Sequence, residues 1–213
     1  MLAPPSPALT NGLLALVEDI RQKIGSALLD VAIGYNTVLL IIDFSVIPRT
    51  ELLAWLNTLP APANEQTYKS KLQPDLTLPV YYGHEVAPDL EPLGAVLGIT
   101  DKEIIELHSE TVYFAYATGF APGFCYLGDI DKRLQQPRRA TPRPMIAAGS
   151  VAIAEQQTAI YPRSSPGGWH ILGRCPLPLF DLTQSPPAKI KIGQWVQFCP
   201  IDRNEFLKLG GEL

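Results

Sequence analysis

Apolar residues recur with helical spacing near the start of the chain and with strand-like spacing directly after it. In the first pattern they lie three or four positions apart, at Leu13, Leu16, Val17, Ile20 and Ile24. This spacing predicts an amphipathic helix over about 13–28. Two short apolar runs follow at 29–33 and 37–44, and the Gly34 and Asn36 between them tolerate positive φ. The second pattern therefore predicts two strands joined by a tight turn.

The rest of the first third continues this mixture of helix and strand. A second helix is predicted over 51–59, because Pro48 and Thr50 precede an apolar pattern that ends before Pro60. Residues 60–76 are predicted to form a polar loop and 77–82 a strand. Residues 1–10 carry no periodic pattern and predict an irregular start.

The middle of the chain predicts two short helices, over 87–98 and 100–110. Thr100 and Glu103 have the spacing of a capping box, which marks the start of the second helix. The β-prone run 111–120 follows. After Gly119 the helical period disappears, and short apolar runs alternate with Gly and Pro at 149–154, 158–162, 168–173, 177–182 and 194–201. Such runs predict a barrel or sandwich, closed by a short helix at 202–209.

Composition excludes several classes of protein. The 213 residues are 46% hydrophobic with a net charge of −4, so the chain can build a core and lacks the basic character of a nucleic-acid-binding domain. No apolar run reaches the length of a membrane helix, and the first 20 residues do not resemble a secretory signal. Three widely spaced cysteines indicate neither a disulfide framework nor a metal site. We therefore expect a cytoplasmic protein.

Basic residues gather in a segment that proline keeps from forming a helix. Lys132, Arg133, Arg138, Arg139 and Arg143 fall among Pro137, Pro142 and Pro144. Proline favours an extended conformation here, and arginines along it could share one phosphate or carboxylate ligand. The alternative is a solvated loop that pairs with the acidic region at 85–110. The residues alone favour neither interpretation.

Glycines, histidines and aromatic residues of this region add little that is specific. Gly123, Gly149, Gly167 and Gly168 fit barrel corners as well as close approach to a ligand. His84, His108 and His170 lack metal-ligand spacing. Phe124, Tyr126, Tyr161 and Trp169 are more typical of a core than of a binding surface. These residues indicate a ligand cleft but specify no reaction.

Five ordered motifs resemble the allophanate hydrolase subunit 1 family, also called the carboxyltransferase C/D subdomain family. They are GFAPGFCYL, PRRATPR, AGSVAIA, TAIYP and SPGGWHILGR, and the resemblance covers about residues 12–209. The family includes the B-type component of bacterial 5-oxoprolinase and the Kip-type inhibitors of sporulation kinases. It implies an α+β fold, with a small N-terminal α/β domain at 1–79 and a cyclophilin-like β-barrel at 80–213. The first strand of the family's N-terminal domain is expected to be absent.

The resemblance also implies a function that depends on partners. We expect the B-type subunit of an ATP-dependent 5-oxoprolinase, which hydrolyses the lactam 5-oxoproline to glutamate with a C-type subunit of homologous fold and an A-type subunit. ATP with Mg would bind in the assembled complex and not to this chain alone. The alternatives are a Kip-type inhibitor of a sensor histidine kinase and one half of a urea carboxylase or allophanate hydrolase unit.

Motif positions nominate the site residues. The expected catalytic residues are Glu85, Asp89 and Arg143. The expected substrate or nucleotide contacts are Arg138, Arg139, Ser150, Gln157, Pro166, Gly167, Gly168 and Trp169. No metal ligands are expected. The chain departs from the family pattern at His84, Ala152 and Glu155, where the family usually has glycine.

Overall fold

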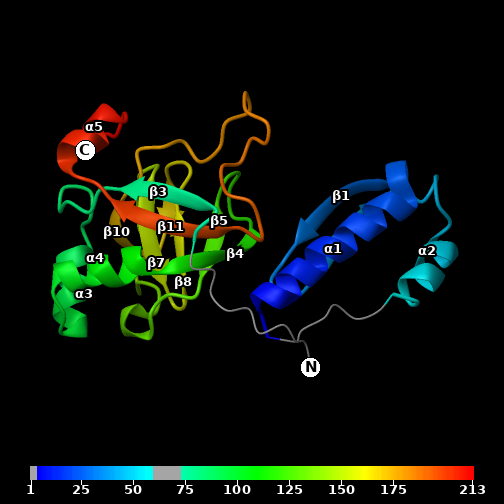
Figure 1. Ribbon diagram of the computed structural model, residues 1–213, viewed down its shortest axis with the longest axis horizontal. Coiled ribbons are helices and arrows are strands. Elements are labelled where there is room, and N and C mark those ends of the chain that lie inside the picture. Colours follow the sequence, from blue (N-terminus) through cyan, green and yellow to red (C-terminus); the bar gives the residue numbers. More distant parts are fainter. Residues whose placement is uncertain (1–3, 60–72) are drawn as a thin grey trace. The chain divides into compact units, whose positions relative to one another are not determined.

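The computed structural model describes residues 4–59 and 73–213, which belong to two compact units (Figure 1). Unit 1 is Met1–Lys69 and unit 2 is Ser70–Leu213. The expected boundary at residue 79 differs from this division, because the strand at 76–80 pairs within unit 2. The polar loop expected at 60–76 lies largely outside the described residues.

Unit 1 begins with the long helix α1, Pro7–Ile24. The Ser6 side chain accepts a hydrogen bond from the Leu9 backbone N–H at 3.2 Å, and Pro7 occupies the first helical position. Both are strong helix-start signals, so the expectation of an irregular start over 1–10 was wrong from Pro7 onward. The missed signal was the Ser–Pro pair before the apolar pattern.

A hairpin and a second helix complete the described part of unit 1. Strands β1, Leu28–Ile33, and β2, Val38–Ile42, pair antiparallel, and α2 spans Arg49–Leu56. The turn closes with a hydrogen bond from the Gly34 N–H to the Thr37 carbonyl at 2.8 Å. Ile20, Ile24 and Leu52 bury their side chains against the inner face of the hairpin. The two expected strands and both helices of this region are confirmed.

Unit 2 is built on a seven-stranded sheet in the order β10-β7-β8-β5-β4-β11-β3. Its strands are β3 Leu76–Val80, β4 Val112–Thr118, β5 Cys125–Gly128, β7 Ser150–Ala154, β8 Gln157–Ile160, β10 His170–Arg174 and β11 Trp195–Pro200. Tyr81, just after β3, exchanges two backbone hydrogen bonds with Arg174 at the end of β10. This bridge joins the two edges of the sheet, and the α+β class with a barrel-like second unit is confirmed.

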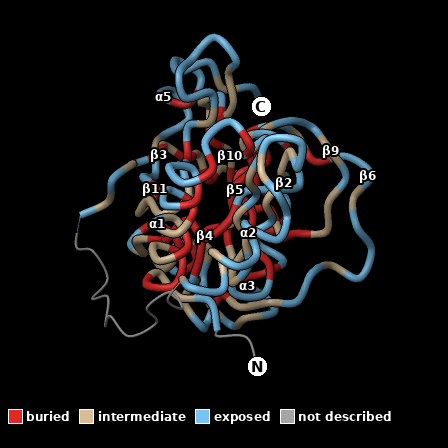
Figure 2. The backbone as a smooth tube through the Cα atoms, turned by 90° about the vertical axis from the view of Figure 1, so that its right-hand side faces the viewer, coloured by how far each residue is buried: buried red, intermediate tan, exposed pale blue. Residues whose placement is uncertain are grey.

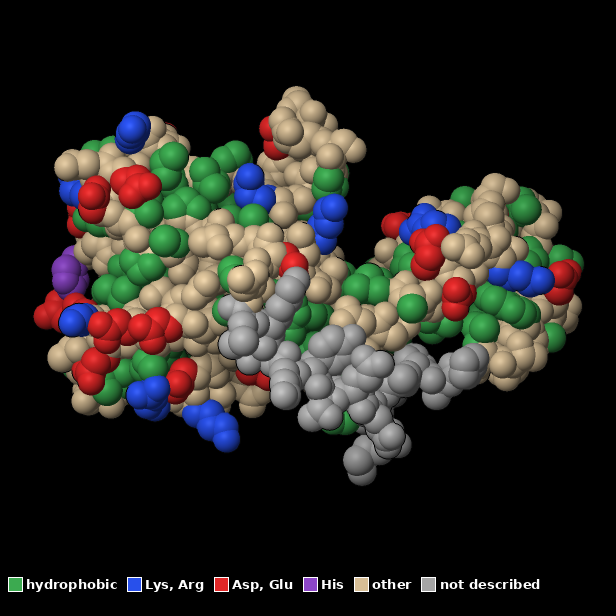
Figure 3. Space-filling model, in the orientation of Figure 1, with side chains coloured by type: hydrophobic (Ala, Val, Ile, Leu, Met, Phe, Trp, Pro, Cys, Tyr) green, Lys and Arg blue, Asp and Glu red, His purple; other side chains and the backbone are tan. Residues whose placement is uncertain are grey.

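Helices lie at the ends of the barrel strands. α3 spans Leu90–Leu97, α4 Asp101–Glu110 and α5 Arg203–Lys208, with a 3-10 turn at Lys132–Leu134. The capping box at Thr100 and Glu103 is present as expected. Acidic side chains gather over the end of unit 2 that carries α3 and α4 (Figure 3), and they include the exposed Glu103, Glu106 and Glu110. None of the described helices is both long and apolar enough to traverse a lipid bilayer.

Both faces of strand β7 are buried. Val151 and Ile153 belong to the main core inside the barrel, whereas Ala152 and Ala154 belong to a second, aromatic cluster on the other face. This alternation follows from the two-residue period of a strand. Figure 2 shows the barrel strands as the most continuously buried part of the chain. The second cluster therefore sits on a floor of alanine side chains.

Sequence periodicity failed to predict three short strands and predicted one strand that does not form. β5 was not expected, nor was the ribbon of β6, Arg143–Ile146, with β9, Ser165–Gly167. The strand expected at 177–182 was wrong, since that segment contributes only an isolated bridge between Phe180 and Ala188. Proline at 176 and 178 prevents a continuous ladder there.

Candidate functional site

Aromatic rings converge on the outer face of β7 and β8 around a cavity of about 90 Å³. We call this the aromatic cavity, and its lining residues are Phe120, Phe124, Tyr126, Arg138, Tyr161, Gly167, Gly168 and Trp169. Phe124 lies at the centre of the rings, in edge-to-face contact with Tyr126 at 4.9 Å and with Trp169 at 5.9 Å between ring centroids. Phe124, Tyr161 and Trp169 are almost fully buried, so the accessible ring surface belongs to the exposed Phe120 and the half-buried Tyr126.

Small residues make room for these rings. Ala152, Ala154 and Ala159 form the floor of the cluster, where larger side chains would occupy the space of Tyr161 and Trp169. Gly167 permits a still closer approach, because a Cβ there would lie 2.3 Å from the Tyr161 hydroxyl oxygen and 2.7 Å from Ile146. A Cβ at the neighbouring Gly168 would meet no atom closer than 3.7 Å. A side chain at Gly167 would thus force Tyr161 or Ile146 to move, whereas one at Gly168 would not.

Two non-glycine residues of the described chain adopt positive φ, and both belong to this region. Phe120 has φ 65° on the loop that enters β5, and Glu155 has φ 56° in the turn between β7 and β8. L-residues avoid this conformation, and such strain tends to occur at functional sites. Phe120 lines the aromatic cavity, while the Glu155 carboxylate lies 3.6 Å from the Arg138 Nε that faces it.

The arginines of the basic segment separate onto two sides. Arg138 lines the aromatic cavity and its side chain is 60% exposed. Arg139 and Arg143 instead converge on Asp89, the residue before α3, whose side chain is only 4% exposed. Arg143 donates to both Asp89 carboxylate oxygens, at 2.7 and 2.8 Å, and Arg139 donates to one of them at 2.7 Å. Arg139 and Arg143 therefore pair with the acidic region at 85–110, as the alternative interpretation expected, although the pair is buried and not part of a solvated loop.

Asp89 also holds β10 in place. Its carboxylate accepts a fourth hydrogen bond, from the Ile171 backbone N–H at 2.7 Å. Burial raises the pKa of Asp89, but the hydrogen bonds from Arg143 and Ile171 and the charges of both arginines outweigh it, so the pKa lies below its ordinary value. The carboxylate is ionised and joins α3, β10 and the basic segment behind the aromatic cavity.

The remaining expected site residues lie elsewhere. Glu85 accepts hydrogen bonds from the Tyr81 hydroxyl at 2.9 Å and from Arg203 Nε at 3.0 Å, beside α5. Ser150 is buried at the start of β7, Gln157 begins β8, and Pro166 lies in β9. None of these four lines the aromatic cavity. Of the expected contacts, the cavity brings together Arg138, Gly167, Gly168 and Trp169.

Sequence reasoning missed part of the cavity wall. Phe120 was not singled out, and Phe124, Tyr126 and Tyr161 were interpreted as core. The available signal was the density of aromatic residues within GFAPGFCY and TAIYP, since both segments flank turns next to the basic segment. Within the described residues, no group of three His, Cys, Asp or Glu side chains could hold a metal ion.

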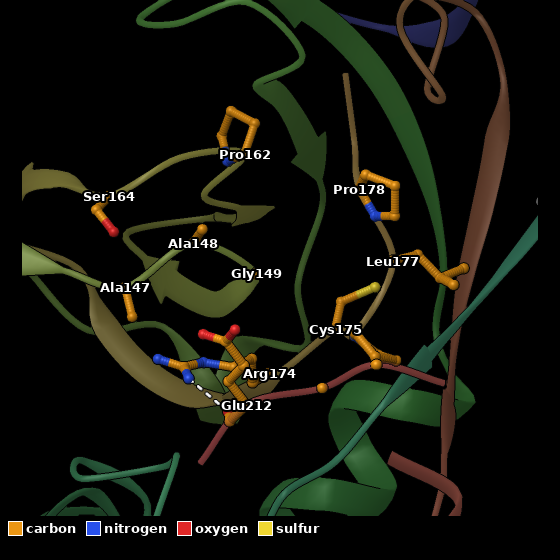
Figure 4. Close-up of a pocket in the computed structure, with 13 residues that line it drawn as sticks. Ala147, Ala148, Gly149, Pro162, Ser164, Arg174, Cys175, Leu177, Pro178 and Glu212 are labelled. Atoms are coloured by element: carbon orange, nitrogen blue, oxygen red, sulfur yellow. Dashed lines mark hydrogen bonds between the residues drawn. The ribbon is translucent and has the colours of Figure 1, made fainter. Parts of the chain in front are cut away.

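A second cavity, of about 350 Å³, shares no lining residue with the first (Figure 4). Arg174 lies along one side of it and donates a hydrogen bond to the Glu212 carbonyl at 2.6 Å, with Cys175 and Pro178 on the opposite side. Burial lowers the pKa of Arg174, partly offset by the Glu212 charge. The described residues that line this cavity include one basic group and no aromatic ring.

Comparison with known sequences gives a consistent result. Residues 2–190 match the family model described as carboxyltransferase domain, subdomain C and D. Relatives named as the B subunit of 5-oxoprolinase are 43% identical over 129 residues in Bacillus subtilis (strain 168), 42% over 125 in Escherichia coli O157:H7 and 38% over 171 in Haemophilus influenzae. The matches cover 61%, 59% and 80% of this chain. They span 54%, 57% and 78% of the relatives, so the first two are matched over little more than half their length.

Solved structures share the fold. The crystal structure of TTHA0988 superposes with a TM-score of 0.79 at 31% identity, over 94% of this chain and 38% of that one. The conserved uncharacterized protein PH0987 from Pyrococcus horikoshii gives a TM-score of 0.61 at 35% identity, over 93% and 90%. The Kluyveromyces lactis urea carboxylase gives 0.69 at 16% identity, over 94% and 20%, and this likeness concerns the fold alone.

Proposed function

We propose that this chain, which belongs to the family of the carboxyltransferase domain, subdomain C and D, is the B-type subunit of an ATP-dependent 5-oxoprolinase. The observation that carries the proposal is its 38–43% identity to three proteins named as B subunits of 5-oxoprolinase. All residues that line the aromatic cavity lie within the family match at 2–190. We assign the substrate to this cavity because Arg138, Gly167, Gly168 and Trp169, which the family motifs nominate, all line it.

The aromatic cavity supports a binding role that depends on partners for chemistry. Its eight lining residues, all within the described part of unit 2, include no carboxylic acid, histidine, lysine, serine or cysteine. Hydrolysis of a lactam needs a nucleophile and a group that handles its proton, and among these residues only the Tyr126 and Tyr161 hydroxyls could serve. Burial raises the pKa of Tyr161, which makes its hydroxyl a poor proton acceptor. We infer that C-type and A-type subunits provide the reactive groups, and that the chain alone has no turnover.

ATP does not fit the aromatic cavity. A volume of about 90 Å³ is far below the roughly 300–1,000 Å³ of sites for larger ligands. Arg139 and Arg143, which were expected to contact a nucleotide or phosphoryl group, direct their guanidinium groups to Asp89. We therefore place ATP and Mg in the assembled complex, outside this cavity, and assign Asp89 and Arg143 a positioning role behind it.

Co-expression tests this function. The chain is produced with the neighbouring reading frames of its genome, and ATP hydrolysis is measured with and without 5-oxoproline. We expect hydrolysis that depends on 5-oxoproline in the purified complex and none with the chain alone or with the partners alone. Turnover by the single chain would overturn the dependence on partners. A stable complex without this activity would overturn the assignment to an oxoprolinase.

A further inference from the structure

Neighbouring backbone contacts turn Arg138 away from the buried arginines. The Glu155 N–H donates to the Gln136 carbonyl, and the Arg139 N–H donates to the Gly168 carbonyl, at 2.6 and 2.8 Å. These bonds hold the segment extended between the β7–β8 turn and the cavity wall. Side chains of an extended segment alternate in direction. Arg139 therefore faces Asp89, whereas Arg138 faces the aromatic cavity and Glu155.

Arg138 is the one cationic side chain among the described residues that line the aromatic cavity. Its guanidinium can donate two parallel hydrogen bonds to a carboxylate, and the accessible parts of the Phe120 and Tyr126 rings can contact an apolar ring. A small cyclic acid matches both features. A nucleotide is too large for the cavity, and a basic ligand would be repelled by the Arg138 charge.

Glu155 already forms a weak ion pair with Arg138. The turn between β7 and β8 has two residues, because Ala154 pairs with Gln157. Glycine, asparagine or aspartate is usual at positive φ in such a turn, and glutamate is unfavourable there. The strained backbone nevertheless directs a carboxylate to within 3.6 Å of Arg138 Nε, and both side chains remain about 60% exposed. An exposed ion pair of this length is weak enough for a ligand to displace.

We propose that Arg138 binds the carboxylate of a small cyclic acid seated in the aromatic cavity, and that Glu155 is a counter-ion which this carboxylate displaces. The inference rests on the proposed function only for the identity of the acid, 5-oxoproline. Glu155 thereby sets the affinity of the site, because the ligand must compete with it for one guanidinium. Neutralising Glu155 strengthens binding, and neutralising Arg138 weakens it.

The three tryptophans of the chain provide a direct test. Trp169 lines the cavity, whereas Trp55 lies in α2 of unit 1 and Trp195 begins β11. The ¹⁵N-labelled chain is titrated with 5-oxoproline, with cyclopentanecarboxylate and with 2-pyrrolidinone, which has the lactam ring without a carboxylate. We expect both acids to shift the indole N–H signal of Trp169 and to leave those of Trp55 and Trp195 in place.

Two charge variants separate the counter-ion from the rest of the site. Glu155→Gln keeps the side-chain length and the turn residue's positive φ, so its effect reports the charge alone. We expect it to tighten binding of 5-oxoproline about two- to fivefold, the range of a weak exposed ion pair. Arg138→Gln weakens the same binding about tenfold or more. Neither variant changes the response to 2-pyrrolidinone.

Each outcome decides one part of the proposal. Unchanged or weaker affinity in Glu155→Gln would overturn the counter-ion, and binding that is insensitive to Arg138→Gln would overturn the carboxylate contact. If no acid shifts Trp169 while the assembled complex hydrolyses ATP with 5-oxoproline, this inference fails and the proposed function stands. If cyclopentanecarboxylate binds with the expected charge dependence and 5-oxoproline does not, the inference stands and the proposed substrate fails.

Discussion

Arg143 and Asp89 form a two-point contact across 54 residues of sequence, with the guanidinium donating to both carboxylate oxygens at 2.7 and 2.8 Å. The Asp89 side chain is 4% exposed and the Arg143 side chain 23% exposed, so solvent screens the pair little. Arg139 and the Ile171 N–H complete the surroundings of the carboxylate. This buried network ties the basic segment to the start of α3 and to β10.

Asp89→Asn should lower stability markedly. The amide keeps the shape of the side chain but leaves Arg139 and Arg143 without a counter-charge. Breaking a buried ion pair from one side costs about 3 kcal/mol or more. Urea unfolding of the purified chain measures the change. Arg138→Ala is the matched control, since its exposed pair with Glu155 predicts a loss of at most about 1 kcal/mol. Equal stability of Asp89→Asn and the unmodified chain would refute the structural role of the network.

We expect alanine substitution to lower stability at Gly167 and to have almost no effect at the adjacent Gly168. Gly167→Ala brings a methyl group against the buried Tyr161 and Ile146 and should destabilise the chain by about 1–3 kcal/mol through overpacking. Gly168→Ala adds a methyl group at ordinary contact distance and should change stability by less than about 0.5 kcal/mol. Thermal melts of both variants provide the comparison. Similar melting temperatures for the two would show that the wall near Tyr161 is looser than its contacts indicate.

His108 predicts a loss of stability in mild acid. Its imidazole is fully buried, stacked on Phe198 at 4.7 Å between ring centroids and hydrogen-bonded to the Tyr82 and Thr158 hydroxyls at 2.8 Å. Burial lowers the pKa of His108 to about 3, whereas the unfolded chain has the ordinary value of 6.5. Between these values the unfolded state binds a proton that the folded state excludes. Stability therefore falls as the pH falls below about 6.5.

The contribution of His108 to the pH dependence of the unfolding free energy can be measured separately. A single proton contributes about 1.4 kcal/mol per pH unit below the unfolded pKa. Urea unfolding between pH 6.5 and 4.5 should show this slope in the unmodified chain and a shallower one in His108→Gln, which cannot take up the proton. The glutamates with lowered pKa values, Glu85 and Glu103, also take up protons in the unfolded state near pH 4.5, but they do so in both proteins and cancel in the comparison. Parallel pH profiles for the two proteins would contradict the neutral buried histidine.

Sequence patterns correctly predicted the helices and strands that are specified by residues close together in the chain. The capping box placed α4, and continuous apolar runs placed β4, β7 and β11. The ribbon of β6 and β9 was not predicted from the sequence, because Pro144 and Pro166 weaken its hydrogen-bond ladder and only the fold brings its two strands together. The ion-pair partner of Arg139 and Arg143 could not be predicted either, because only the fold brings it close to them. Asp89 lies 50 and 54 residues before Arg139 and Arg143, a distance over which spacing carries no information.

The motifs predicted more of the candidate site than the hydrophobic periodicity did. The family match over residues 2–190 confirms the family that they indicated. It nominated Arg138, Gly167, Gly168 and Trp169, which the structure brings to one cavity. It also grouped Arg138 with Arg139, although the two neighbours face opposite sides. Alternation along an extended segment decides that difference, and it could be stated only once the segment's hydrogen bonds were known.

The most direct test of the central claim compares two exposed arginines in the assembled complex. Arg138 lines the aromatic cavity, whereas Arg133 is paired with Asp131 at 2.9 Å in the 3-10 turn, and their side chains are 60% and 65% exposed. The measurement is the KM for 5-oxoproline in ATP hydrolysis by complexes that carry Arg138→Ala or Arg133→Ala. The account predicts a rise of about tenfold to a hundredfold for Arg138→Ala, the value of a hydrogen bond to a charged group, and no change for Arg133→Ala. An unchanged KM in Arg138→Ala, in a complex that assembles and turns over normally, would contradict the assignment of the aromatic cavity to the substrate.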